Sequence, residues 1–172
     1  MGEPKMAGRT KIVESQTITR PADTTAYTSG DLVANSTTAG SVVPFLFENV
    51  VRTTGYRAKI KRASLNASGV AITNGSFRLH LFSATPAPVG AGDNAAIAAD
   101  FDTNAAKYVG YLDIVLVVAG TGGNKGWSVT AAPDLNFVSV NSKNLWGLLE
   151  AKAGYTPASA ETFKIELEVE AS

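Results

Sequence analysis

The chain has 172 residues, of which 45% are apolar and 17% charged, and its 15 basic and 15 acidic side chains cancel. This balance gives no general attraction for nucleic acid, because such binding needs a basic surface that releases phosphate counterions. There is no cysteine, which excludes disulfides, thiolate nucleophiles and thiolate metal sites. The length favours one domain over two.

The first residues, 1–11, are basic, contain glycine and show no periodicity, so we expect a flexible N-terminal arm. They have no apolar core of the signal-peptide kind, and we expect no targeting segment. The longest purely apolar run, residues 114–119, is too short to cross a bilayer, so no membrane partner is expected. Residues 12–172 are predicted to form a single β-sandwich domain.

From residue 12 onward, short runs rich in Val, Ile, Leu and Phe alternate with Gly, Asn, Asp and Pro clusters, a pattern typical of strands and turns. The last run has the clearest alternation, with apolar side chains on one face and charged ones on the other. The predicted strands are residues 41–48, 56–67, 77–83, 108–118, 127–131, 137–140, 145–153 and 162–170.

The connections between these strands carry their own signals. Asn74 and Gly75, between apolar flanks, predict a tight turn because both residues tolerate positive φ. The glycine-rich residues 120–126 predict a flexible connection. Residues 84–106 break the pattern, and we expect a surface loop followed by a short helix that Asp93 caps.

About eight strands with irregular spacing and long connections predict an all-β fold, a two-sheet β-sandwich of the jelly-roll kind. In that order the first strand pairs with the eighth, the second with the seventh, the third with the sixth and the fourth with the fifth. An immunoglobulin-like sandwich is the alternative, although the cysteine pair typical of that fold is absent.

Chemistry-bearing residues are few. The single histidine, His80, lies in the middle of a predicted strand, a poor position for a general base, so we expect a structural or surface role. Asp100, Asp102 and Asn104 match the start of a calcium-binding loop, but Ala105 replaces the required glycine, and a solvated loop is the better interpretation. We therefore predict no catalytic, cofactor or metal site, and no enzyme.

A row of basic side chains with no intervening acid lies in and near the second predicted strand: Arg52, Arg57, Lys59, Lys61 and Arg62. The row could bind an acidic partner, could form a solvated outer face, or could pair across strands with Glu166, Glu168 and Glu170. The last possibility conflicts with the jelly-roll order, which places the second and eighth strands in different sheets.

The most distinctive segment of the sequence is TITRPADTTAYTSGDLV, at residues 17–33. It resembles the opening of capsid decoration (cement) proteins of tailed phages. The resemblance continues more loosely through VPFLFENVVRTTGYRAKIKRASL, FRLHLFSATP and YVGYLDI, and covers roughly residues 15–170.

The resemblance implies a jelly-roll-like β domain that is made in the bacterial host cytoplasm and binds the outer capsid surface of the virion. It implies the major capsid protein as partner, a homotrimer, and stabilisation of the capsid without chemistry. We expect the contacts in the arm and in the TRPADTTAY segment, with strand-edge packing as an equal alternative for Arg20 and Tyr27. The candidate contact residues are Lys5, Arg9, Lys11, Arg20, Pro21 and Tyr27.

A second hypothesis is a phage tail or fibre module that recognises a host-surface glycan. It predicts exposed aromatic side chains grouped with Asp or Asn, for which Trp127 near Asn124 is the sequence candidate. A β-sandwich hydrolase or lyase is disfavoured by the single histidine and by the lack of a carboxylate pair.

Overall fold

The computed structural model describes residues 9–69, 75–87, 89–97, 99–118, 124–128, 135–138 and 142–171. Within these residues the chain is all-β, with one short helix and one 3-10 turn, and the predicted fold class is confirmed. The strands are β1 (Arg9–Glu14), β2 (Ile18–Thr19), β3 (Leu32–Val33), β4 (Phe45–Phe47), β5 (Arg57–Ala67), β6 (Ser76–Phe82), β7 (Tyr108–Val118), β8 (Asn124–Ser128), β9 (Leu135–Val138), β10 (Leu145–Ala151) and β11 (Thr162–Ala171). The helical elements are α1 (Ala99–Asn104) and the 3-10 turn η1 (Ala105–Lys107).

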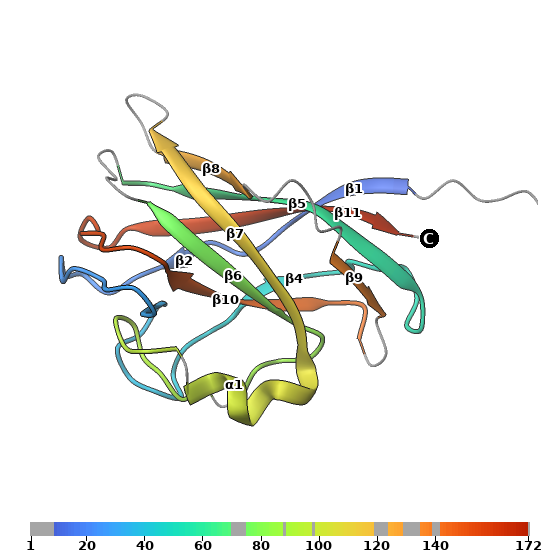
Figure 1. The fold of residues 1–172 in the computed structure, drawn as a ribbon, viewed down its shortest axis with the longest axis horizontal. Coiled ribbons are helices and arrows are strands. Elements are labelled where there is room, and N and C mark those ends of the chain that lie inside the picture. The colour runs from blue at the N-terminus through green and yellow to red at the C-terminus, as the bar shows by residue number, and fades with distance from the viewer. Residues whose placement is uncertain are drawn as a thin grey trace, which may run out of the picture.

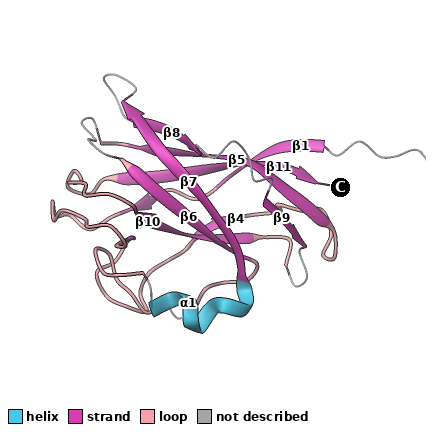
Figure 2. Cartoon of the chain, viewed as in Figure 1, coloured by secondary structure: helices cyan, strands magenta, loops and turns pink. Residues whose placement is uncertain are grey.

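The described strands form one antiparallel sheet in the order β1-β11-β5-β8-β7-β6-β10-β3. The short strands β2, β4 and β9 pair with β11, β10 and β5 respectively. The sheet bends back on itself through β8 and β7, so that β11 and β5 face β10, β6 and β4 as in a β-sandwich (Figure 1). Figure 2 shows the same view by secondary structure, with α1 lying below β6 and β10.

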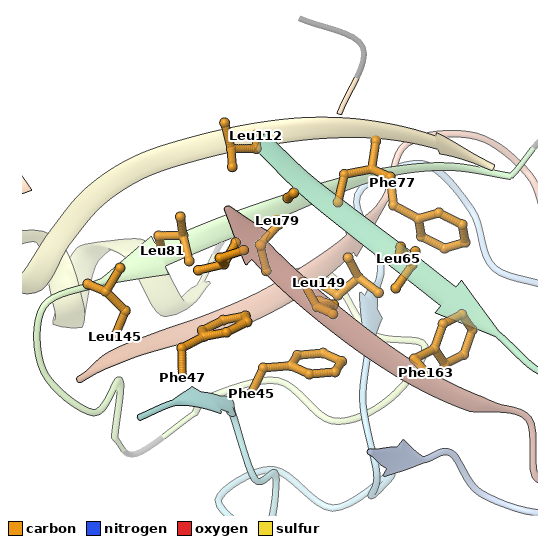
Figure 3. Close-up of a cluster of buried hydrophobic side chains, with 14 of the residues drawn as sticks. Phe45, Phe47, Leu65, Phe77, Leu79, Leu81, Leu112, Leu145, Leu149 and Phe163 are labelled. Atoms are coloured by element: carbon orange, nitrogen blue, oxygen red, sulfur yellow. The ribbon is translucent and has the colours of Figure 1, made fainter. Parts of the chain in front are cut away.

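The core lies between these two layers. The inward residues of β4, β6 and β10 contact those of β5 and β11, and phenylalanine and leucine fill the space (Figure 3). Strand β11 follows the predicted alternation: Phe163, Ile165, Leu167 and Val169 are buried, and the charged residues between them are only partly buried. Burying one face of each strand favours folding by about 25 cal/mol per Å² of apolar surface removed from water.

A second, smaller apolar cluster lies on the opposite face of β6 and β10. Phe82 and Leu148 point outward from the main core and are covered by the loop segment around Val89 and Ile97 and by Phe101 of α1. These two strands are therefore buried on both faces, which explains the nearly continuous runs of apolar residues in FRLHLF and LWGLL.

The strand pairing differs from the expected jelly-roll order. Of the four expected pairs only the fourth with the fifth, β7 with β8, is present in the described residues. Strand β5 pairs with β11 instead of β10, and this brings the basic row beside the glutamates. The cross-strand interpretation is correct: Arg62 Nε lies 3.2 Å from Glu168 Oε2, and Lys61 Nζ lies 3.9 Å from Glu170 Oε2.

The two open edges of the sheet approach each other at Ser15, which bridges Phe47 of β4. Gln16 holds this seam with its side chain. Its Nε2 donates to Pro44 O at 2.8 Å, and its Oε1 accepts from Leu46 N at 2.7 Å. A primary amide offers the same donor and acceptor as a peptide unit, so Gln16 pairs with β4 as a strand residue would.

Several predicted local features need correction. Residues 9–11, assigned to the flexible arm, lie in β1 and pair with β11; residues 1–8 lie outside the described part. Asn124, Lys125 and Gly126, assigned to a flexible connection, begin β8. The predicted turn at Asn74 and Gly75 rests on Asn74, which lies outside the described residues, as do residues 119–123.

Candidate functional site

The residues expected to contact a partner fall into different environments. Arg9 is exposed on β1, and Lys11 is partly buried beside it, with its Nζ donating to Asn49 O. Burial and the nearby Arg52 guanidinium lower the pKa of Lys11. Pro21 is partly buried, and Lys5 lies outside the described residues.

Arg20 and Tyr27, by contrast, are buried, with 2% and 1% of their surface exposed. Neither side chain presents a surface to another protein in this conformation. For these two residues burial favours the packing alternative over a direct contact. The local reason is a third residue, Asp93, which lies 5% exposed between them.

We call Arg20, Tyr27 and Asp93 the buried polar cluster. Arg20 Nη2 lies 3.0 Å from Asp93 Oδ2, and Arg20 Nε donates to Tyr27 Oη at 2.9 Å. Tyr27 Oη donates to Asp93 Oδ1 at 2.6 Å, and Ala34 N donates to the same oxygen at 2.7 Å. Every buried charge is thus matched by hydrogen bonds, which is the condition for burying charge without a large cost.

The electrostatics of the cluster follow from this geometry. Burial would lower the pKa of Arg20, but its hydrogen bonds to Tyr27 and Asp23 and the charge of Asp93 outweigh burial and raise it. Burial, together with the hydrogen bond to Asp93, raises the pKa of Tyr27 well above its ordinary value. At neutral pH the guanidinium is therefore charged and the phenol neutral.

Asp93 was expected to cap a helix, but its carboxylate is an internal acceptor and α1 begins at Ala99. The cluster continues into a neighbouring loop through Tyr155, whose ring stacks on Tyr27 with centroids 5.6 Å apart. Tyr155 Oη donates to the buried Glu161, which also accepts from Gly69 N at 3.0 Å. The distinctive segment 17–33 is therefore fastened to the loops around Asp93 and Tyr155.

The outer face of β7 and β8 presents a different feature, a row of exposed large side chains. Tyr111 and Val115 project from β7, and Trp127 projects from β8 directly opposite Val115. They are 46%, 41% and 40% exposed. We call these three residues the apolar row.

Cations hold the two aromatic rings of the row in place. Arg62 Cζ lies 4.2 Å from the Trp127 ring centroid, with Lys125 Nζ at 4.9 Å from it. Arg78 Cζ lies 3.9 Å from the Tyr111 ring centroid and is fixed by two hydrogen bonds to Asp113, of 2.6 and 2.9 Å. Such cation–π contacts restrict the rings without covering them completely.

The same bidentate pair shifts two pKa values. The hydrogen bond from Arg78 lowers the pKa of Asp113, and the hydrogen bond to Asp113 raises the pKa of Arg78. Because both side chains are partly exposed, this pair fixes geometry more than it adds stability.

His80 faces away from the main core and is 5% exposed. Its Nε2 lies 2.7 Å from Glu150 Oε2, and its Nδ1 lies 3.2 Å from Tyr108 Oη. Burial lowers the pKa of His80, with Glu150 acting in the opposite direction. Both ring nitrogens thus have partners in the fold, and nothing in the sequence around His80 indicates Glu150, which lies 70 residues away.

Two further findings concern only the described part of the chain. No group of three or more His, Cys, Asp or Glu side chains there could hold a metal ion. Asp102, which was assigned to a solvated loop, is exposed but lies in α1. No helix there has the length and apolar character needed to cross a membrane.

No protein-family model matches the sequence, and neither does any curated protein. Among solved structures, a weak similarity is found to a chain in the structure of deformed wing virus, a honeybee pathogen, with 12% sequence identity and a TM-score of 0.27. The match covers 97% of this chain, which spans 44% of the other. The likeness is weak at this TM-score, and no conclusion about the role of this chain follows from it.

Proposed function

We propose that this protein is a structural component of a phage virion that binds the outer surface of the assembled capsid and stabilises it. The proposal starts from the resemblance of residues 17–33 and the later segments to capsid decoration proteins. Its partner is the major capsid protein, and the resemblance favours a homotrimer. The protein works through binding and carries out no reaction.

The observation that best supports a binding role is the apolar row. Tyr, Trp and Arg are the residue types that most often dominate the free energy of protein–protein contacts. Here Tyr111 and Trp127 stand on a sheet, and Arg78 and Arg62 stack on their rings. Side chains that are already fixed lose little conformational entropy on binding, so their contacts contribute more of their free energy to affinity.

Stabilisation of the capsid follows from mass action. A protein that binds only the assembled, expanded lattice stabilises that lattice by RT ln(1 + [L]/Kd). Several copies held together by symmetry would engage several capsid subunits at once and gain avidity. The exposed Arg9 at the start of β1 offers a further contact outside the apolar row.

Binding of the protein to undecorated, expanded capsids of its own virus, measured by co-sedimentation, tests the proposal. Trp127→Ala and Tyr111→Ala are each expected to weaken binding about 30-fold, since a central aromatic contact contributes about 2 kcal/mol. Tyr56→Ala is the matched control, because Tyr56 is 54% exposed just before β5, far along that strand from the Trp127 partner Ser64.

Trp127→Ala and Tyr111→Ala must first show the unfolding midpoint of the wild type, so that any loss of binding is due to the changed surface and not to unfolding. Capsid binding that is unchanged in both variants would remove the apolar row from the proposal. Absence of capsid binding by the wild type, with retention on immobilised host glycans, would favour the glycan-binding alternative, for which Trp127 near Asn124 is the candidate from the sequence.

A further inference from the structure

The imidazole of His80, on β6, is in contact with three other elements, β10, β7 and α1. The residue lies on β6, its Nε2 contacts Glu150 of β10, and its Nδ1 contacts Tyr108 at the start of β7. The edge of its ring packs against Phe101 of α1, with centroids 4.6 Å apart. One titratable ring therefore joins the sheet to the α1 cover, by which we mean α1 and η1.

The hydrogen-bond partners assign the proton on this ring. An ionised carboxylate only accepts, so Nε2 carries the hydrogen and donates to Glu150. Burial raises the pKa of Tyr108 to about 12, so its hydroxyl is neutral and donates to Nδ1. The neutral tautomer satisfies both nitrogens. A protonated ring would put an N–H against the Tyr108 hydroxyl and force that hydroxyl to turn its own hydrogen elsewhere.

The charges that face His80 are balanced before it titrates. Arg78 of β6 is paired with Asp113 of β7. Lys152, which follows β10, has its Nζ 3.2 Å from Glu150 Oε1. Among the described side chains, Tyr111 of β7 is a further titratable neighbour, with its ring centroid 6.2 Å from that of His80.

On the cover, Asp102 is exposed, and Lys107 donates to Thr85 O and Asn104 Oδ1. A proton on His80 would therefore give these described groups a net positive charge in a site removed from water, because the Glu150 carboxylate beside the ring is already shared with Lys152.

The α1 cover rests on the sheet mainly through aromatic contacts that surround His80. Phe101 packs at 5.4 Å from Tyr108 and 6.3 Å from Phe82, measured between ring centroids, and Phe82 packs at 5.5 Å from Tyr108. The helix has six residues, too few to be stable without such packing. A charge on the His80 ring, which packs against Phe101, would therefore act directly on the docking of α1.

We propose that His80 is a pH-sensitive latch for the α1 cover: the neutral ring keeps α1 docked on β6 and β10, and protonation of the ring releases it. This inference concerns the isolated protein and goes beyond the proposed binding to capsids.

The direction with pH follows from linkage. With α1 docked, burial dominates and holds the pKa of His80 below the ordinary histidine value of about 6.5. With α1 released, water reaches the ring while Glu150 stays beside it, so the pKa is higher than in the docked state. The released state binds more protons, and docking weakens as pH falls from about 6.5 through the lower docked value.

Nuclear magnetic resonance of the intact protein tests the latch, because His80 is the chain's single histidine and gives one set of ring signals. Between pH 8 and pH 5 we expect the nuclear Overhauser contacts between His80 and Phe101 to disappear as the ring titrates. In His80→Gln, which keeps one donor and one acceptor but does not titrate, α1 should remain docked throughout.

Glu150→Gln provides a second variant, needed if His80→Gln fails to fold. It removes the charge that favours the imidazolium, so the release of α1 should move about 1 pH unit lower. A purely structural Glu150 would not shift the midpoint. The inference is overturned if the contacts of Phe101 persist while His80 protonates, or if α1 is released at the same pH in either variant as in the wild type.

Discussion

Arg20 is a buried guanidinium whose role depends on one distant carboxylate. Its Nη2 reaches Asp93 at 3.0 Å and Asp23 Oδ1 at 3.0 Å, but only the Asp93 side chain is itself buried. A buried ion pair contributes little net stability, yet removing one partner is costly because the other charge stays buried and uncompensated.

We therefore expect Asp93→Asn to lower the free energy of unfolding by about 3 kcal/mol. Asp23→Asn is the matched control and should have a much smaller effect, because the Asp23 side chain is 38% exposed. Urea unfolding at neutral pH measures both. Equal losses in the two variants would mean that Asp93 does not neutralise Arg20.

At this scale the sequence allowed only part of the site to be predicted. Nothing near Arg20 in TRPADTTAY indicates burial, because its partner Asp93 is 73 residues away and belongs to a loop that packs against it only in the folded chain. The sequence singles out Trp127, but its grouping with Tyr111 depends on the pairing of β8 with β7. An exposed Tyr111 beside Asp113 could have been suggested by the alternation of YVGYLDI alone.

Strand β8 shows why an element can need a glycine in its centre. Gly126 pairs with Leu116 of β7 and Leu65 of β5. A Cβ at this position would lie 2.5 Å from Val115 O and 2.7 Å from Leu116 Cα, both backbone atoms that cannot move aside without separating the strands.

Gly126→Ala should accordingly destabilise the protein by about 3 kcal/mol, as other overpacked substitutions do. Gly154→Ala is the control, because the nearest heavy atom to its added Cβ is 3.9 Å away; its effect should stay within about 0.5 kcal/mol. Thermal unfolding compares the two. If Gly126→Ala unfolds with the wild-type midpoint, β7 and β8 are not held as tightly as the geometry indicates.

Strand existence was largely predictable, and strand partners were not. Periodicity located β7 at residues 108–118, as observed, and the alternation of β11 was read correctly. Strands β2 and β3 have two residues each, too few for any period. A register shift between Glu168 and Val169 leaves Lys61 opposite no residue, so Arg62 takes over the outward position, which strict alternation could not predict.

At the scale of the whole molecule, the sheet closes almost completely around one core, with Gln16 holding the seam and α1 covering the outer face of β6 and β10. The Ser15–Phe47 bridge and the Gln16 hydrogen bonds cover part of the β4 edge, and a covered edge disfavours uncontrolled edge-to-edge association. A body of this kind suits a role in which shape and a fixed contact surface matter, as proposed for the apolar row.

The most direct test of the proposed function is a density map of the virion whose genome encodes this chain. We predict a β-sandwich on the outer capsid lattice, at repeated symmetric positions, with β7 and β8 turned toward the major capsid protein. A map with an undecorated outer lattice, and the chain located only in the tail or missing from the particle, would contradict the proposed function.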